Sequence, residues 1–221
     1  VELGDQKVDV RPWPFVTPGE KPEFTHDPHV WTDVKQADVQ VFNIGTALEK
    51  TQSDNPAAAD SIKAAVEKYE AQLTLLDQWV RDSISSVPEE NRVLFTSHDA
   101  FGYFANAYDV KFIGAALSDF NHQQDATAEH INKAAEEVKA SGAKALFAEN
   151  SNNSKSIEAI ARAAGVKAIT NDDALYGDSL GPAGSPGETY IGSIIHNVTT
   201  LVTAWGGTPA PLPPEISNNA K

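Results

Sequence analysis

The feature that most constrains the fold is a long run of helical periodicity between residues 57 and 86. This spacing is typical of one amphipathic helix, which at 1.5 Å per residue would be about 45 Å long. An ordinary helix packed on one core is the simpler interpretation, but a helix longer than a small domain is wide favours a connection between two regions of the chain. The apolar residues recur at alternating spacings of four and three: Ile62, Val66, Tyr69, Leu73, Leu76 and Val80.

The chain before this helix has two parts. Residues 1–32 are rich in proline and aromatic residues without a sustained period, so we expect an irregular arm. Helical spacing then runs from Asp33 to Lys50, and the sequence TQSDNP breaks it with a cap signal. Two helices therefore precede residue 87.

After Pro88 the pattern changes to short apolar strands that alternate with helices. Glycines at 142 and 165 are expected to end two of these helices. The alternation predicts an α/β fold with a parallel sheet. A Gly- and Pro-rich loop, a helix over 189–205 and an extended, solvated tail complete the pattern. The expected strands are 93–97, 111–117, 144–149 and 166–170, and the expected helices between them are 101–108, 128–140 and 155–164.

Composition excludes several classes of function. The 221 residues include 31 acidic and 17 basic side chains, for a formal net charge of −14, which repels nucleic acid and anionic membranes and favours a cationic partner. The chain has no cysteine, so disulfides and thiolate metal sites are excluded. No apolar run approaches the roughly 20 residues of a spanning helix, so we expect no membrane insertion by this chain.

Three side chains at the ends of elements are candidate metal ligands. In an open parallel sheet, ligands bind outside the carboxyl ends of the strands, and His98 follows the first strand directly. Asp178 lies in the irregular loop before the last helix, and His29 lies in the sequence DPHVW. Two imidazoles and a carboxylate suit a first-row divalent ion such as Zn²⁺, Mn²⁺ or Fe²⁺. A hydrogen-bonded histidine that caps the next helix is the alternative interpretation of His98.

Enzyme signatures are absent from the sequence. It contains no H-E-x-x-H, G-x-S-x-G, Walker or dinucleotide motif. Glu149 or Asp99 could act as the base of a metallohydrolase, but a carboxylate in the Asn- and Ser-rich sequence FAENSNNS is more often a helix cap. We therefore expect a binding protein and not an enzyme.

Five motifs in order carry a resemblance to a known family. They are DPHVWTDV, SHDAFGYFANAY, ALFAENSNNSKSIEAIARAAGV, LYGDSLG and YIGSIIHNVTTLV, and they span Asp27 to Trp205. The chain resembles the manganese- and zinc-binding solute receptors of bacterial ABC importers, the TroA-like cluster A-I group. The resemblance implies two α/β lobes joined by one long helix, with a divalent metal between the lobes. It also implies an N-terminally truncated chain: 1–55 as the remnant of an N-terminal lobe, 56–87 as the backbone helix, 88–207 as the C-terminal lobe and 208–221 as an extended tail.

The resemblance also assigns the ligands. His29 matches the histidine of the family's DPHxW motif, His98 the ligand after the first strand of the C-terminal lobe, and Asp178 the aspartate before the last helix. The family's first ligand would lie upstream, in the missing part of the N-terminal lobe. His98 favours zinc, whereas the lack of a histidine-rich loop before DPHVW argues against zinc, so manganese and zinc stay open and iron is a third option.

The expected function is therefore capture of a divalent metal ion for an ABC permease. The expected location is extracytoplasmic, in the periplasm or on the cell surface, with a lipid anchor in the full-length precursor. The alternatives are a metal-dependent hydrolase and a surface adhesin, a role in cell adhesion that some members of the family have.

Overall fold

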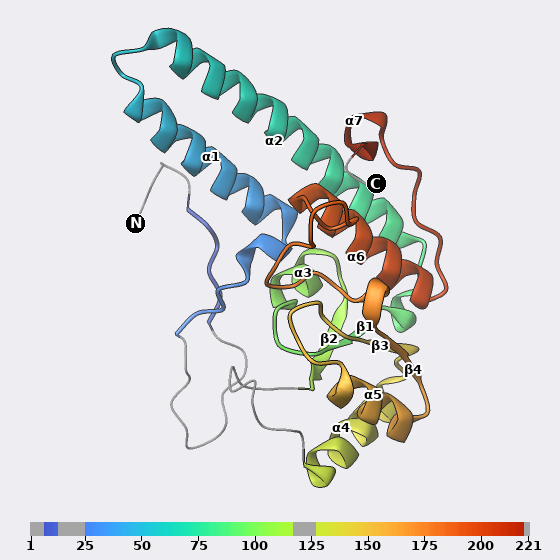
Figure 1. Ribbon diagram of the computed structural model, residues 1–221. Helices are drawn as coiled ribbons and strands as arrows, with labels where there is room; N and C mark the ends of the chain where they lie inside the picture. Colours follow the sequence, from blue (N-terminus) through green and yellow to red (C-terminus); the bar gives the residue numbers. More distant parts are fainter. Residues whose placement is uncertain (1–6, 13–24, 117–126, 219–221) are drawn as a thin grey trace. The chain divides into compact units, whose positions relative to one another are not determined.

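The computed structural model describes residues 7–12, 25–116 and 127–218. It divides the chain into two compact units, Val1–Gln78 and Trp79–Lys221 (Figure 1). The boundary falls inside helix α2 (Pro56–Ser85), a single helix of 30 residues. The predicted long helix over 57–86 is therefore confirmed, displaced by one residue at each end. Much of the predicted irregular arm, and Leu117 at the end of the second predicted strand, lie outside the described residues.

Two helices dominate the N-terminal unit. The 3-10 turn η1 (Val30–Thr32) leads into α1 (Val34–Thr51). The Asp33 carboxylate accepts a hydrogen bond from the backbone N–H of Lys35 at 2.9 Å, which caps the helix and fixes where it begins. Gly45 lets α1 approach α2 closely, because a Cβ at this position would come within 2.5 Å of Val66 Cγ2.

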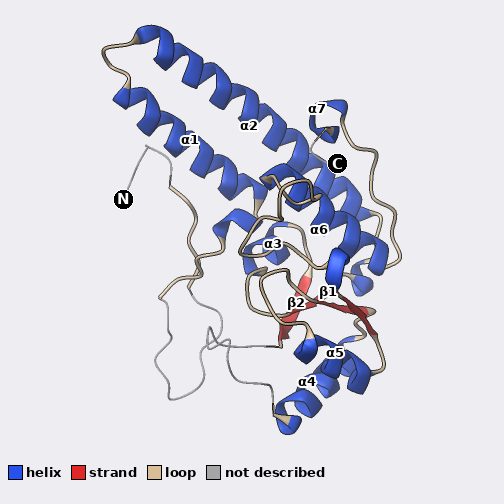
Figure 2. Ribbon diagram, in the orientation of Figure 1, coloured by secondary structure: helices blue, strands red, loops and turns tan. Residues whose placement is uncertain are grey.

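The C-terminal unit is built on short parallel strands (Figure 2). Strand β1 (Val93–Thr96) pairs with β2 (Lys111–Ala115), and β3 (Ala145–Phe147) pairs with β4 (Lys167–Ile169), both in parallel. Strand β1 also lies against β3. The prediction of a parallel α/β sheet is confirmed, with strands shorter than the apolar runs that encode them.

Helices cover both faces of these strands. The pair α4 and α5 packs on one face, with Ile157, Ile160 and Val138 in a core shared with Phe95 of β1. On the other face Trp205, just after α6, packs its ring edge-on against Phe147 and donates its indole N–H to the Val93 carbonyl at 3.0 Å. The remaining elements are η2 (Glu89–Asn91), α3 (Gly102–Ala107), α4 (Ala128–Ser141), α5 (Lys155–Ala164), η3 (Asn171–Asp173), α6 (Tyr190–Ala204) and α7 (Pro214–Ser217).

Glycine ends α4 and α5 as the sequence predicts. Gly142 and Gly165 follow the two helices with φ values of 75° and 76°, in the left-handed region that glycine adopts without steric cost. Each helix then returns the chain to the sheet within a few residues. Strands β3 and β4, which begin after these stops, pair in parallel, so both end at the same edge.

The tail after α6 differs from the extended, solvated segment that its proline content suggested. The Trp79 indole N–H donates to the Ala210 carbonyl at 2.8 Å, and the Ala210 N–H donates to Ser83 Oγ at 3.0 Å. The short helix α7 follows, with Ile216 buried. Side chains of α2 thus satisfy the backbone of the tail, which proline composition alone could not reveal.

Candidate metal centre

The backbone of His98 is fixed just beyond the end of β1. Its N–H donates to Glu149 Oε1 at 2.9 Å, and its carbonyl accepts a hydrogen bond from Thr96 Oγ1 at 2.6 Å. All three side chains are buried. Because both backbone groups have partners, the backbone of His98 is held in place and so is the direction of its Cα–Cβ bond.

The His98 imidazole lies between two carboxylates. Nδ1 is 2.7 Å from Glu149 Oε2, and Nε2 is 2.8 Å from Asp178 Oδ2. The two acids differ in exposure, since the Glu149 side chain is fully buried whereas that of Asp178 is 31 % exposed. Glu149 therefore forms the inner, structural side of the cluster and Asp178 its solvent side.

The two carboxylates change the protonation of His98. Burial by itself disfavours the charged ring and lowers its pKa, but the hydrogen bonds and negative charges of Asp178 and Glu149 outweigh burial and raise the pKa of His98 from 6.5 to about 10. At neutral pH the ring is therefore an imidazolium in an ion pair with both acids. A metal ion that binds Nε2 must first displace this proton.

Glu149 is neither the helix cap nor the free base that its sequence context suggested. The N-cap of α5 is Ser154, whereas the Glu149 carboxylate binds both the backbone and the ring of His98. The Glu149 N–H in turn donates to Ser97 Oγ at 3.1 Å. A side chain at Gly177 would collide with Glu149 Oε2, so the absence of a Cβ there lets the loop of Asp178 approach the cluster.

Two asparagines that the sequence analysis did not single out lie beside the cluster. Asn150 Nδ2 donates to Ser179 Oγ at 3.0 Å, next to Asp178. Asn152 Nδ2 lies 3.1 Å from His98 Nδ1, to which it can donate only when that nitrogen carries no proton. These residues directly follow β3, which is the position where an open sheet carries function. That position is the signal in the sequence that could have found them.

The third predicted ligand, His29, belongs to the N-terminal unit. Asp27 Oδ1 accepts from the His29 N–H at 3.0 Å and lies 2.7 Å from Nδ1. The ring also makes an edge contact with Trp31, with centroids 5.5 Å apart. A carboxylate that binds Nδ1 fixes the orientation of the ring and leaves Nε2 available as a ligand, which is the arrangement usual for metal-binding histidines.

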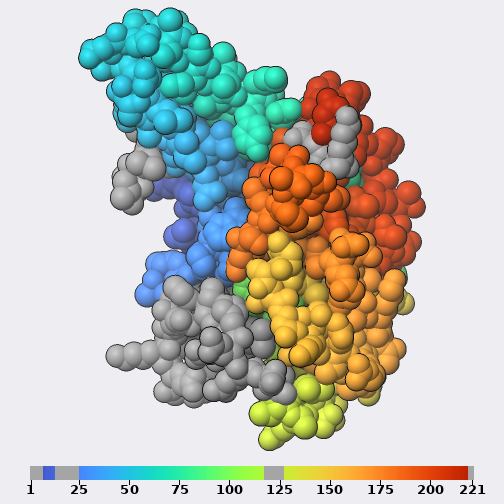
Figure 3. All heavy atoms as spheres, viewed as in Figure 1, coloured from blue at the N-terminus to red at the C-terminus, as the bar shows by residue number. Residues whose placement is uncertain are grey.

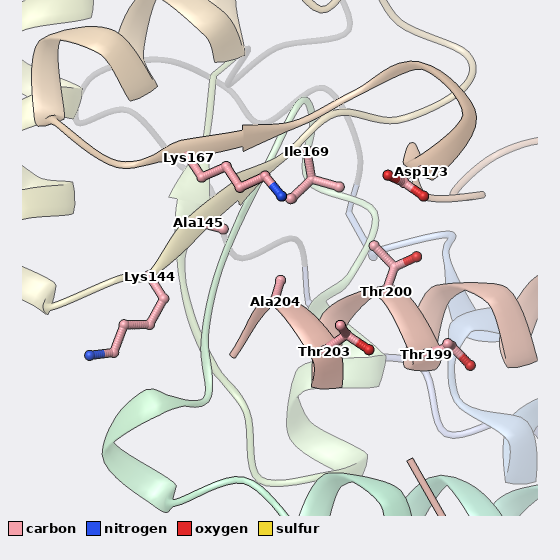
Figure 4. A pocket seen from close by; sticks show the side chains of 9 residues that line it. All are labelled: Lys144, Ala145, Lys167, Ile169, Asp173, Thr199, Thr200, Thr203 and Ala204. Atoms are coloured by element: carbon pink, nitrogen blue, oxygen red, sulfur yellow. The ribbon is translucent and has the colours of Figure 1, made fainter. Parts of the chain in front are cut away.

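A separate hollow on the C-terminal unit has different chemistry. It has a volume of about 410 Å³ and is lined by Lys144, Lys167 and Asp173 together with threonines of α6 (Figure 4). Its lining contains one carboxylate and no imidazole, which is a poor donor set for a transition metal.

The loop that carries Asp178 is a different part of the surface. It is drawn in orange and lies on the face seen in Figure 3.

The chain matches one known protein family over most of its length. The family described as ZnuA, the periplasmic zinc-uptake complex component A, matches residues 3–204. The chain belongs to this family. The ZnuA family comprises transport proteins that bind a solute, and its fold is the one described above.

Relatives in the ZnuA family are named for two different metals. The manganese-binding lipoprotein MntA of Bacillus subtilis is 34% identical over 182 residues, which cover 81% of this chain and 58% of MntA. The zinc-binding protein TroA of Treponema pallidum is 34% identical over 187 residues, which cover 84% of this chain and 58% of TroA. The chain thus spans somewhat more than half the length of these relatives.

Solved structures agree on the fold. The periplasmic zinc-binding protein TroA from Treponema pallidum superposes with a TM-score of 0.71 at 32% identity, covering 85% of this chain and 66% of that one. The Fe(III)-bound YtgA of Chlamydia trachomatis superposes with a TM-score of 0.73 at 23% identity, covering 87% and 68%. The α/β architecture is therefore shared beyond close sequence similarity.

Proposed function

We propose that this chain is the metal-binding part of an extracytoplasmic receptor that captures a divalent transition-metal ion and delivers it to an ABC permease. His98 and Asp178 of the C-terminal unit and His29 of the N-terminal unit are the proposed ligands, with a fourth position filled by water or a further side chain. No chemical reaction of a substrate is catalysed in this function. The protein's task is to bind the ion tightly and then to release it.

The observation that carries the proposal is the placement of His98 between two carboxylates. Glu149 holds Nδ1 at 2.7 Å, so the other ring nitrogen faces Asp178. A carboxylate behind a histidine fixes the ring and increases its basicity as a ligand. His29 with Asp27 repeats this arrangement, and two such imidazoles with one carboxylate form an open zinc-type donor set.

Manganese and zinc are both candidate cargoes. Two nitrogen ligands favour zinc over manganese, which prefers oxygen donors, yet relatives at equal identity are named for manganese and for zinc. Iron is a third candidate as Fe²⁺, because imidazole and carboxylate ligands also suit that ion. The choice between these metals is decided by binding measurements.

The other two functions have weaker support. Family membership favours transport over the hydrolase, and the relatives named above are metal-binding proteins rather than enzymes. None of the residues described above specifically supports a role in adhesion. Within the described residues, none of the helices combines the length and apolar character needed to cross a bilayer, and the family's periplasmic description supports an extracytoplasmic location.

A titration tests the proposed function. Chelator-stripped protein is titrated calorimetrically with Zn²⁺ and with Mn²⁺, and Mg²⁺ serves as the control ion. We expect one ion per chain for at least one transition metal, with an affinity at least about 100-fold above that for Mg²⁺, because imidazole ligands select against hard cations. Equal binding of all three ions would contradict the proposal.

Metal binding is also expected to release a proton from His98. Because the ring has a pKa of about 10 in the metal-free protein, the affinity should rise about tenfold per pH unit between pH 7 and 9. Calorimetry in buffers of different ionisation enthalpy measures the proton count, which should fall by about one in His98→Ala. An affinity that does not change with pH over this range would show that metal binding does not displace a proton from His98.

The same shift affects the stability of the metal-free protein with the opposite sign. The folded-state pKa of His98 lies above the value of 6.5 for an unperturbed histidine. The stabilisation from its ion pairs is therefore complete below pH 6.5 and is lost as the pH rises toward 10. Deprotonation of the ring at high pH is a single event that both ends the ion pair and frees Nε2, and it accounts for the tenfold rise in affinity per pH unit.

A further inference from the structure

Helix α6 carries a buried amide that binds the backbone just before Asp178. The Asn197 side chain is 2 % exposed. Its Oδ1 accepts the Tyr176 N–H at 2.8 Å, and its Nδ2 donates to the Tyr176 carbonyl at 2.8 Å. Both backbone groups of Tyr176 are thus bound by one side chain from another element, whose amide offers an acceptor and a donor on neighbouring atoms.

The loop that follows is folded around the ring of Tyr176. The ring packs against the His196 imidazole of α6, with centroids 4.8 Å apart. A side chain at Gly187 would collide with the Tyr176 ring, and one at Gly181 would collide with Ser185 Oγ and crowd the same ring. The Gly181 N–H closes the loop by donating to the Gly187 carbonyl at 2.8 Å. The path of the loop is therefore defined by where Tyr176 is held.

Asp178 lies two residues after Tyr176 and contacts His98 from this loop. Its side chain is 31 % exposed, so surrounding side chains do not confine it as they confine Glu149. The backbone on either side of Asp178 is also bound, by Asn197 at Tyr176 and by Asn150, which donates to the Ser179 carbonyl at 3.3 Å. Of these two anchors, Asn197 is buried and binds both backbone groups of Tyr176 at 2.8 Å, whereas Asn150 is exposed and donates to Ser179 and Leu180 at 3.0–3.5 Å.

We infer that Asn197 is a positioning residue that keeps Asp178 against the metal site and slows release of the ion. The effect on ion release rests on the proposed function, whereas the anchoring of the loop rests on the hydrogen bonds between Asn197 and Tyr176. An ordinary packing role, in which Asn197 only stabilises the contact between α6 and the loop, is the competing interpretation. The two differ in whether release of the ion changes when the fold is intact.

Three variants of the full chain separate these interpretations. Asn197→Ala removes both hydrogen bonds, and Asn197→Asp keeps the acceptor but places a carboxylate against the Tyr176 carbonyl. Ser193→Ala is the matched control, because Ser193 is a buried polar residue of the same helix whose hydroxyl donates at 2.8 Å to the Tyr190 carbonyl within α6. Asn197→Asp is nearly isosteric and serves as the test if the alanine variant does not fold.

The measurements are amide hydrogen exchange over residues 176–181, transfer of Zn²⁺ to a chromogenic chelator, and thermal unfolding. We expect Asn197→Ala to exchange at least about tenfold faster in this segment and to release Zn²⁺ roughly 10–100-fold faster, the effect usual for residues that orient a ligand. Asn197→Asp should be intermediate, and Ser193→Ala should match the wild type.

Two results would overturn the inference. Unchanged exchange in a folded Asn197 variant would show that the amide does not hold the loop. Faster exchange with wild-type release of Zn²⁺ would show that it holds the loop without positioning Asp178. If the wild type took up no Zn²⁺ or Mn²⁺, the proposed function would be wrong, and the predicted effect on ion release would be wrong as well. The exchange data would still show whether Asn197 anchors the loop.

Discussion

Replacing His98 by alanine is expected to reduce the affinity for Zn²⁺ by at least about 100-fold, or about 2.7 kcal/mol. The substitution removes a nitrogen ligand and also the group that joins Glu149 to Asp178, at 2.7 and 2.8 Å. Glu149 then keeps the His98 N–H but loses its ring partner inside the fold, which should cost about 1–3 kcal/mol of stability. Competition titration with a chelator measures the first effect, and thermal unfolding measures the second.

A histidine outside the cluster provides the control for this experiment. His26 is exposed, and its Nδ1 lies 3.0 Å from the hydroxyl of its neighbour Thr25. His26→Ala should therefore bind metal like the wild type. Wild-type affinity in His98→Ala would remove the residue from the site and leave the proposed function without its central observation.

Replacing Glu149 by glutamine is expected to weaken metal binding roughly 10–100-fold although the side chain keeps its shape. The carboxylate accepts from both the backbone N–H and Nδ1 of His98, at 2.9 and 2.7 Å. A glutamine has one acceptor and one donor end, so in either orientation one of these contacts is lost. With its carbonyl on the backbone N–H, its NH₂ faces Nδ1 and forces the ring proton to Nε2, the nitrogen that must bind the metal.

The same substitution at Glu158 is the matched control. Glu158 lies in α5 of the same unit and accepts a hydrogen bond from Ser154 Oγ at 2.7 Å, an interaction that an amide oxygen preserves. Glu158→Gln should bind metal normally. Nitrogen NMR of the His98 ring should show both nitrogens protonated in the metal-free wild type and a neutral ring with its proton on Nε2 in Glu149→Gln. Unchanged protonation with unchanged affinity would show that Glu149 does not orient the ligand.

Much of the fold could be predicted because its signals are local: apolar periodicity, helix caps and glycines that end helices. The apolar spacing that begins at Ile62 encodes α2, Asp33 begins α1, and glycines at 142 and 165 end α4 and α5. Each of these signals acts within one or two helical turns, so it can be read without knowing the rest of the molecule. The tail was predicted less well, because its conformation depends on Trp79 and Ser83, which are distant in the sequence.

The candidate site shows the same division. Its position after β1 follows from the rule that parallel sheets bind ligands at the carboxyl ends of their strands, and this rule, with the family resemblance, singled out His98. The same rule applied to β3 would have favoured Glu149, but the composition of its loop suggested a helix cap. Composition describes what a segment does on average, whereas the partner of a buried carboxylate is decided by which strand lies beside it.

By itself the sequence determined the helices, the parallel α/β class, the family and the residue types able to bind a metal, since periodicity, caps and motifs are local. Only the tertiary structure decided which acids meet His98 and which amide holds the loop of Asp178. Glu149 reaches His98 from 51 positions away, and Asn197 reaches Tyr176 across 21. Such contacts depend on the order of the strands and the path of one loop, and these are set by packing of the whole unit rather than by any short stretch of the chain.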